Sequence, residues 1–145
     1  MNIASELLAQ IVAHALENPA IECCGIVAVE AAQDGSEPTA TRVYRTENIH
    51  ASALKFEIDP MELLRVNNAI DEEGWEIGAI YHSHVRSEPY PSQTDIGFAA
   101  QWPGVEWIIV GLASGDQPKV RSYLIDGADV KEVAGAELAA RERQS

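Results

Sequence analysis

The order of helical and strand patterns along these 145 residues constrains the fold more than any single motif. Helical spacing of apolar residues predicts helices over residues 3–16 and 59–74 and from about residue 94, whereas strand patterns cover residues 25–31, 41–46, 75–82, 105–112 and 119–125. The first two strands are close enough to form a hairpin. This order predicts an α/β (α+β) fold, with a mixed β-sheet of about five or six strands in one layer flanked by helices.

The start of the second helix has several conventional signals. Asp59 is placed as the N-cap, Pro60 as the first helical residue, and Glu62 comes three residues after the cap. We therefore predict that this helix begins at Pro60 with Asp59 as its cap.

The length and the 46% hydrophobic content indicate one domain with its own core. We assign residues 1–135 to that domain and residues 136–145 to a frayed polar tail. No apolar stretch reaches the roughly 18 residues of a membrane span, and the first residues do not resemble a secretory signal. We therefore expect a cytoplasmic protein with no membrane partner.

The formal net charge of −13 repels phosphates, so nucleic acid is disfavoured as a partner. The charge fits either a surface adapted to high intracellular salt or an acidic face for a basic partner, and the sequence does not separate the two. Cys23 and Cys24 are adjacent, a poor arrangement for a disulfide or for zinc ligands with Cys-x-x-Cys spacing. Reduced, buried thiols are expected.

Two of the four histidines, His82 and His84, are one residue apart where a predicted strand ends. Side chains at i and i+2 share a face of a strand, so both imidazoles lie side by side and Ser83 points away. Two neutral imidazoles bind divalent transition metals, and Zn²⁺ is the most common one held by His and carboxylate in hydrolytic sites. Core or surface histidines also produce this pattern, so the pair alone is weak evidence.

Ser92 and Asp95 follow a proline-containing loop and precede an apolar run. Ser-x-x-Asp at such a place is typical of a capping box, an ordinary helix start. The same geometry can direct the Asp95 carboxylate towards the histidines as a third ligand, because the cap fixes the end of the helix. Two histidines and one aspartate leave a position for water, which is typical of a catalytic zinc site.

A catalytic zinc site also needs a base that is not a ligand, to take a proton from water and return it to the leaving group. Glu22 lies between the first helix and the strand at residue 25, where its side chain can reach the edge of the sheet. Its position alone does not distinguish it from the other acidic residues.

Together, Glu22, His82-Ser83-His84, Ser92 and Asp95 resemble the JAMM motif of the MPN+ metalloproteases, the Mov34/MPN/PAD-1 family. The segments NPAIECCGIVA, FEIDPMELLRV, GWEIGAIYHSH, PSQTDI and PGVEWIIVGL also resemble small bacterial members, so the likeness covers nearly the whole chain. Val85 stands where many bacterial relatives have proline, which concerns the shape of the loop more than the ligands. The resemblance implies a single-domain JAMM/MPN fold similar to that of cytidine deaminases.

The resemblance also implies a role for each residue. His82, His84 and Asp95 would bind Zn²⁺, Glu22 would act as general acid and base, and Ser92 would hydrogen-bond the developing oxyanion. The implied activity is hydrolysis of the peptide bond after the C-terminal Gly-Gly of a ubiquitin-like sulfur-carrier protein. The compact chain has little room for the insertions with which eukaryotic deubiquitinases of this family grip ubiquitin chains.

Two alternatives remain open at this point. The protein could be an isopeptidase that acts on ubiquitin-like conjugates, which differ from the first substrate in the leaving group. It could also be a non-catalytic scaffold like the MPN− domains, although all five motif positions are filled. The sequence does not give the oligomeric state.

Overall fold

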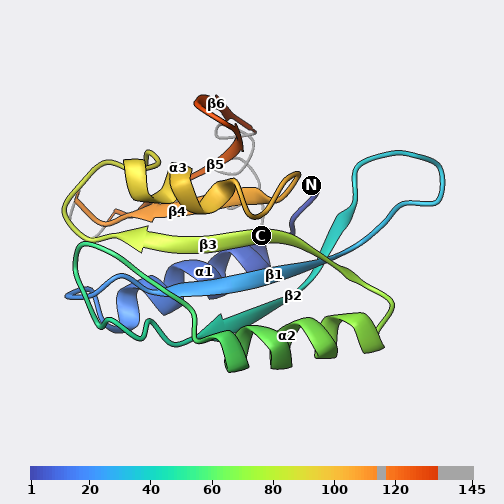
Figure 1. The fold of residues 1–145 in the computed structure, drawn as a ribbon, viewed down its shortest axis with the longest axis horizontal. Helices are drawn as coiled ribbons and strands as arrows, with labels where there is room; N and C mark the ends of the chain where they lie inside the picture. The colour runs from blue at the N-terminus through green and yellow to red at the C-terminus, as the bar shows by residue number, and fades with distance from the viewer. Residues whose placement is uncertain (114–116, 134–145) are drawn as a thin grey trace.

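A computed structural model describes residues 1–113 and 117–133, whose strands form one six-stranded sheet. The elements are α1 (Ser5–Glu17), β1 (Cys24–Glu30), β2 (Thr39–Thr46), α2 (Pro60–Glu72), β3 (Glu76–His84), α3 (Gln93–Ala99), β4 (Glu106–Gly111), β5 (Lys119–Asp126) and β6 (Asp129–Glu132). The strand order is β2-β1-β3-β4-β5-β6 (Figure 1). Only β3 and β4 pair in parallel, and the other neighbours are antiparallel. The mixed sheet with flanking helices confirms the predicted fold class.

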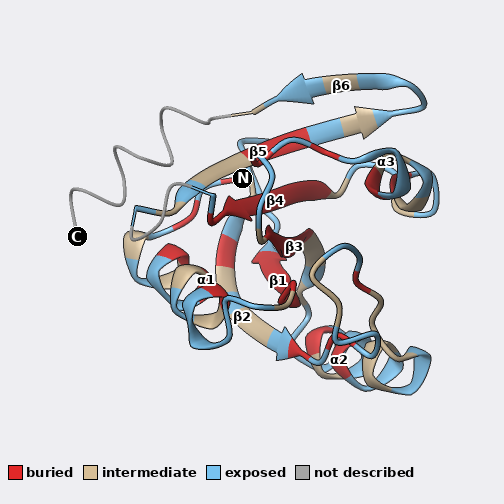
Figure 2. Ribbon diagram, turned by 90° about the vertical axis from the view of Figure 1, so that its left-hand side faces the viewer, coloured by how far each residue is buried: buried red, intermediate tan, exposed pale blue. Residues whose placement is uncertain are grey.

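The helices cover both faces of the sheet, with α1 on one side and α2 and α3 on the other (Figure 2). Alternation along β1 explains this arrangement, because successive side chains point to opposite faces. Val27 shares a core with Leu8 and other residues of α1. Its neighbour Ile26 packs with Ile70 of α2. The central strands are buried on both faces and therefore read as continuous apolar runs in the sequence.

The end of the sheet towards which β3 runs is where three connections come together (Figure 1). They are residues 18–23 between α1 and β1, residues 47–59 between β2 and α2, and residues 85–92 between β3 and α3. Because β3 leaves the sheet between these connections, its last residues face segments that are far apart in the sequence.

The structure confirms the predicted start of α2 but not the capping hydrogen bonds that its residues suggested. Asp59 occupies the N-cap and Pro60 the first turn, but the Asp59 side chain makes no cap hydrogen bond. The Glu62 carboxylate accepts a hydrogen bond from the amide of Glu47 at 2.9 Å and pairs with Arg65 of its own helix at 3.6 Å. The residue pattern located the helix correctly, whereas the contact of Glu62 with Glu47 depends on the tertiary structure.

The strands, the cysteines and the ends of the chain were also the subject of expectations. The strand β6 was not among the five predicted strand segments, and its short, mostly exposed run explains why. Cys23 and Cys24 are free and buried, as expected, and burial raises their pKa to about 11 and about 12. Residues 136–145, assigned to a frayed tail, lie outside the described residues.

Within residues 1–113 and 117–133, no helix has the length and apolar character needed to cross a membrane.

Candidate metal centre and active site

Two imidazole nitrogens and one carboxylate oxygen meet at the end of β3. His82 Nε2 and His84 Nε2 are 3.1 Å apart. Asp95 Oδ2 lies 3.1 Å from His82 Nε2 and 3.2 Å from His84 Nε2. All three residues are buried, and within the described part of the chain they form the single group of His, Cys, Asp and Glu side chains arranged to hold a metal. The three predicted ligands are therefore brought together, and neither cysteine belongs to the group.

The chemistry of these donors fits a divalent metal. His84 Nδ1 bonds the carbonyl oxygen of Glu88 at 2.9 Å, and since a carbonyl only accepts, the hydrogen of neutral His84 is on Nδ1. The lone pair of His84 Nε2 then points towards His82 and Asp95. Ligand atoms about 2.0–2.1 Å from a tetrahedral Zn²⁺ lie about 3.3–3.4 Å from one another, close to the spacing found here.

The protonation states of two of the donors, His82 and Asp95, also favour a cation. Burial lowers the pKa of His82, so its ring is neutral and can offer a lone pair. Burial alone would raise the pKa of Asp95, but the two histidines hold that pKa well below its usual range. The centre thus contains an ionised carboxylate with a neutral imidazole beside it, which is a donor set suited to a divalent transition metal.

Aromatic rings fix the orientation of His82. Phe56 stacks on its imidazole with a centroid distance of 4.5 Å and an interplanar angle of 24°. Trp107 lies edge-on to the same ring at 6.5 Å. A packed ring loses little further rotational freedom when its nitrogen binds a ligand, so this packing pre-orders the donor.

The third donor is positioned by the start of α3. The amide of Ser92 donates to Asp95 Oδ2 at 2.8 Å, and the amide of Asp95 donates to Ser92 Oγ at 3.1 Å. This reciprocal pair is the predicted capping box. The carboxylate oxygen that completes the cap is also the one that faces the two histidines.

Glu22 lies beside this centre without belonging to the donor group. It is 5% exposed and lines a cleft of about 190 Å³ together with His84 and Ser92. Burial raises the pKa of Glu22 to about 7, while nearby His84 opposes this shift and Asp95 adds to it. A carboxyl group that gains and loses its proton near neutral pH has the property that a general acid and base needs.

Two loops contribute to the walls of the cleft. Ala53 and Leu54 come from the connection between β2 and α2, and Arg86 and Ser87 come from the connection between β3 and α3. Leu54 is 87% exposed, so an apolar side chain stands free at the rim.

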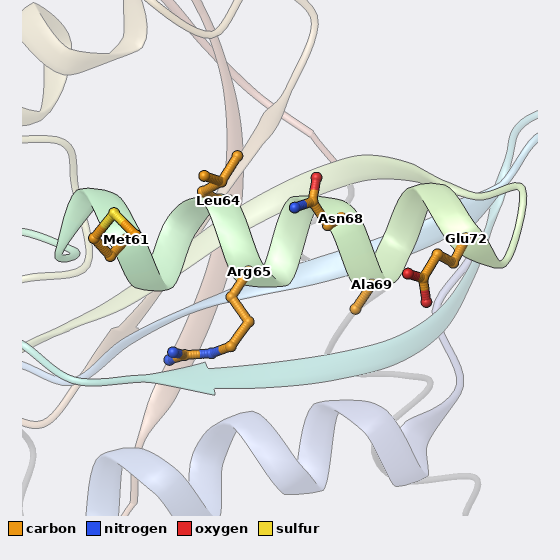
Figure 3. A pocket seen from close by; sticks show the side chains of 6 residues that line it. All are labelled: Met61, Leu64, Arg65, Asn68, Ala69 and Glu72. Carbon is orange, nitrogen blue, oxygen red and sulfur yellow. The ribbon is translucent and has the colours of Figure 1, made fainter.

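A larger hollow lies elsewhere on the molecule and contains none of the predicted site residues. It measures about 490 Å³ and is lined by Met61, Leu64, Arg65, Asn68, Ala69 and Glu72. All six side chains project from α2, and no other element contributes to the lining (Figure 3). The size of a hollow therefore does not locate the candidate active site in this fold.

Two residues that organise the site were not predicted to do so. Ser83 points away from the metal donors, as expected, but its Oγ accepts a hydrogen bond from the amide of Cys23 at 2.8 Å. Asn48, in the loop that follows β2, is buried, and its side chain bonds the backbone of Glu22 and of Lys55. A single sequence offers no signal for Asn48, because an asparagine after a strand is also typical of an exposed turn.

Comparison with known proteins places the chain in a family. Residues 4–126 match the family described as prokaryotic homologs of the JAB domain. The chain belongs to this Prok-JAB family. This match confirms the family resemblance stated from the sequence.

Individual relatives of this Prok-JAB protein agree with the assignment. It is 31% identical over 131 residues to the CysO-cysteine peptidase of Mycobacterium tuberculosis, covering 90% of this chain and 86% of the relative. It is 36% identical over 91 residues to a probable TtuB-protein conjugate cleaving protease of Thermus thermophilus, covering 61% and 57% of the two chains. The solution structure of protein DSY2949 from Desulfitobacterium hafniense superposes with a TM-score of 0.78 at 28% identity, covering 91% and 88%.

Proposed function

We propose that this Prok-JAB protein is a zinc metallopeptidase that hydrolyses the peptide bond after the C-terminal Gly-Gly of a ubiquitin-like sulfur-carrier protein. The observation that carries the proposal is the convergence of two imidazole nitrogens and a carboxylate oxygen within 3.2 Å. One of these donors, His84, lines a cleft together with Glu22 and Ser92. These five residues would supply the metal ligands, the general base and the oxyanion donor of a JAMM-type protease.

His82, His84 and Asp95 would hold Zn²⁺. The metal, when bound, polarises the substrate carbonyl and lowers the pKa of water towards about 7. Glu22 would accept a proton from the attacking water and deliver it to the departing amine, a transfer that suits a carboxyl with a pKa of about 7.

Ser92 would stabilise the oxyanion. Its Oγ already accepts a hydrogen bond from the amide of Asp95, so the hydroxyl hydrogen remains to be donated. A hydrogen-bond donor whose orientation is fixed before the reaction stabilises the transition state more than a mobile one, because it needs no reorganisation as charge develops. The capping box therefore supports both the third metal ligand and the oxyanion donor.

The proposed substrate rests on the cleft and on the relatives. A Gly-Gly tail has no side chains and fits a cleft of about 190 Å³. The name of the mycobacterial relative states that it is a peptidase acting on CysO-cysteine, and this relative matches 90% of the chain. The name of the Thermus relative states that it cleaves a protein conjugate, which favours isopeptidase activity as the second candidate.

The test uses two substrates with different leaving groups. One is a sulfur-carrier protein extended beyond Gly-Gly by a short peptide, and the other is the same carrier joined to a lysine side chain. The zinc-loaded protein should release the intact carrier from the extended fusion, as seen by intact-mass spectrometry, and Glu22→Gln should not. Cleavage of the lysine conjugate alone would replace the first candidate with the second, and failure to bind zinc stoichiometrically would favour a scaffold.

A further inference from the structure

The backbone of Glu22 is held by one loop. Its amide donates to the carbonyl oxygen of Ser52 at 2.8 Å. Its carbonyl oxygen accepts from the side-chain amide of Asn48 at 3.0 Å. Glu22 lies in neither a helix nor a strand, so these two bonds to the connection between β2 and α2 take the place of a regular element.

Asn48 uses its whole hydrogen-bonding capacity in this contact. Nδ2 donates to the carbonyl oxygens of Glu22 and Lys55 at 3.0 and 2.9 Å. Oδ1 accepts from the amides of His50 and Glu57 at 3.1 and 3.2 Å. Two carbonyl partners on one side and two amide partners on the other allow a single orientation of the side chain.

Backbone pairing beside Asn48 also closes the loop on itself. Asn48 and Ile58 form an isolated β-bridge, and the amide of Ile49 donates to the carbonyl oxygen of Glu57 at 3.1 Å. Asn48 is only 6% exposed, so water replaces its four bonds poorly. Its side chain joins both stems of the loop to the Glu22 backbone.

Cys23, which follows Glu22 in the chain, is attached to β3. The amide of Cys23 donates to Ser83 Oγ at 2.8 Å, and the amide of Ser83 donates to the carbonyl oxygen of Cys23 at 3.1 Å. Cys23 is therefore tied to the residue between the two histidines, whereas Glu22 is tied to the loop. The distance from the Glu22 carboxyl to the metal donors depends on both attachments.

We propose that Asn48 is a positioning residue that sets the reach of the Glu22 carboxyl towards the reaction centre. This inference rests on the proposed function, in which Glu22 moves the proton. A displacement of about 1 Å in a catalytic group can cost about 10²-fold in rate, and loss of the Asn48 contact frees the Glu22 carbonyl to move by such a distance. Asn48 itself makes no contact with the reacting atoms in this account.

The decisive substitution is Asn48→Asp. A carboxylate keeps both acceptor bonds to His50 and Glu57 but replaces the two donors with an oxygen that repels the carbonyls of Glu22 and Lys55. Ser52→Ala is the matched control, because Ser52 Oγ accepts only from the amide of Leu54, a bond within the loop. Asn48→Ala is the second variant should Asn48→Asp not give a cooperative thermal melt.

The first measurement does not depend on activity. Hydrogen exchange of ¹⁵N-labelled protein reports the protection of the Glu22 amide, which is bonded to Ser52. We expect Asn48→Asp or Asn48→Ala to lower this protection by about tenfold or more while Ser52→Ala leaves it near the wild-type value. Equal protection of the Glu22 amide in wild type and Asn48 variants would overturn the proposal.

The second measurement is a double-mutant cycle on cleavage of the extended carrier fusion. Asn48→Asp should lower kcat by about 10–100-fold with KM and zinc content nearly unchanged, and it should have less than about a twofold effect in the Glu22→Gln background. If Asn48→Asp lowers kcat by the same factor in the Glu22→Gln background as in the wild type, its role is a general structural one and the proposal is overturned. The same holds if Ser52→Ala lowers kcat as much as Asn48→Asp does. If the wild type cleaves no fusion, the proposed function fails and the exchange experiment still decides the role of Asn48.

Discussion

Ser83 Oγ accepts a hydrogen bond from the amide of Cys23 at 2.8 Å, across 60 residues of sequence. The bond joins the residue between the two histidines to the residue after Glu22, and both partners are buried. The metal donors and the proposed base therefore lie on backbone segments that are directly connected.

Replacing Ser83 with alanine should destabilise the protein. The buried amide of Cys23 would lose its partner, which costs about 1–3 kcal/mol of unfolding free energy. Urea unfolding measures this change, and Ser36→Ala, in an exposed turn, is the control. An unchanged midpoint would mean that water reaches the Cys23 amide.

Variants of the proposed metal ligands should differ in zinc content from variants of Glu22 and Ser92. His82→Ala, His84→Ala and Asp95→Ala each remove a donor and should lose stoichiometric zinc together with activity. Glu22→Gln and Ser92→Ala should keep zinc and lose about 10²-fold or more in kcat. Elemental analysis of the purified variants gives the answer, and a zinc-free Glu22→Gln protein would make Glu22 a ligand.

The stability of the metal-free protein should depend on the ionisation of Glu22. Burial raises its folded-state pKa from 4.5 to about 7, so below pH 4.5 the carboxyl is neutral in both states and costs nothing. Between pH 4.5 and 7 the unfolded state ionises first, and the folded protein loses about 1–3 kcal/mol of stability, which remains lost at higher pH.

Glu22→Gln removes this cost. In the presence of a chelator, it should raise the melting temperature at pH 8 and leave it nearly unchanged at pH 4. Differential scanning calorimetry at the two pH values tests this expectation. A variant that is equally stabilised at both pH values would show that the effect is not electrostatic.

Leu54 should contribute to substrate binding more than to catalysis. Its side chain is 87% exposed at the rim of the cleft, where an apolar group on a protein substrate could cover it. Leu54→Asp should raise KM for a carrier-protein fusion by about tenfold and change kcat little. Met61→Asp, on the outer face of α2, is the matched control, because Met61 is also exposed and lies in the other hollow. Equal effects of both substitutions would point to a general influence of charge.

Much of the fold was predictable because its signals are local. The helix over residues 3–16 and the buried strand over residues 25–31 differ from α1 and β1 by one or two residues at their ends. The Ser92 and Asp95 capping box was predictable for the same reason, since its partners are three residues apart.

The parts that were missed depend on contacts distant in sequence. Glu62 bonds the amide of Glu47 because β2 ends beside the start of α2, and no local pattern contains this information. Asn48 is indistinguishable from a turn asparagine until the backbone of Glu22 is placed against it. The spacing of His82 and His84 could be recognised in the sequence, but whether the pair binds a metal depended on the position of Asp95 in the fold.

The packing of Trp107 against His82 has a practical consequence. Indole emission responds to charge and polarity within a few ångströms, and the His82 ring lies edge-on to Trp107 with a centroid distance of 6.5 Å. A cation arriving at Nε2 changes the electric field at that indole. The molecule thus contains its own optical probe, so that titration with metal can be followed by fluorescence without a dye, a substrate or a label.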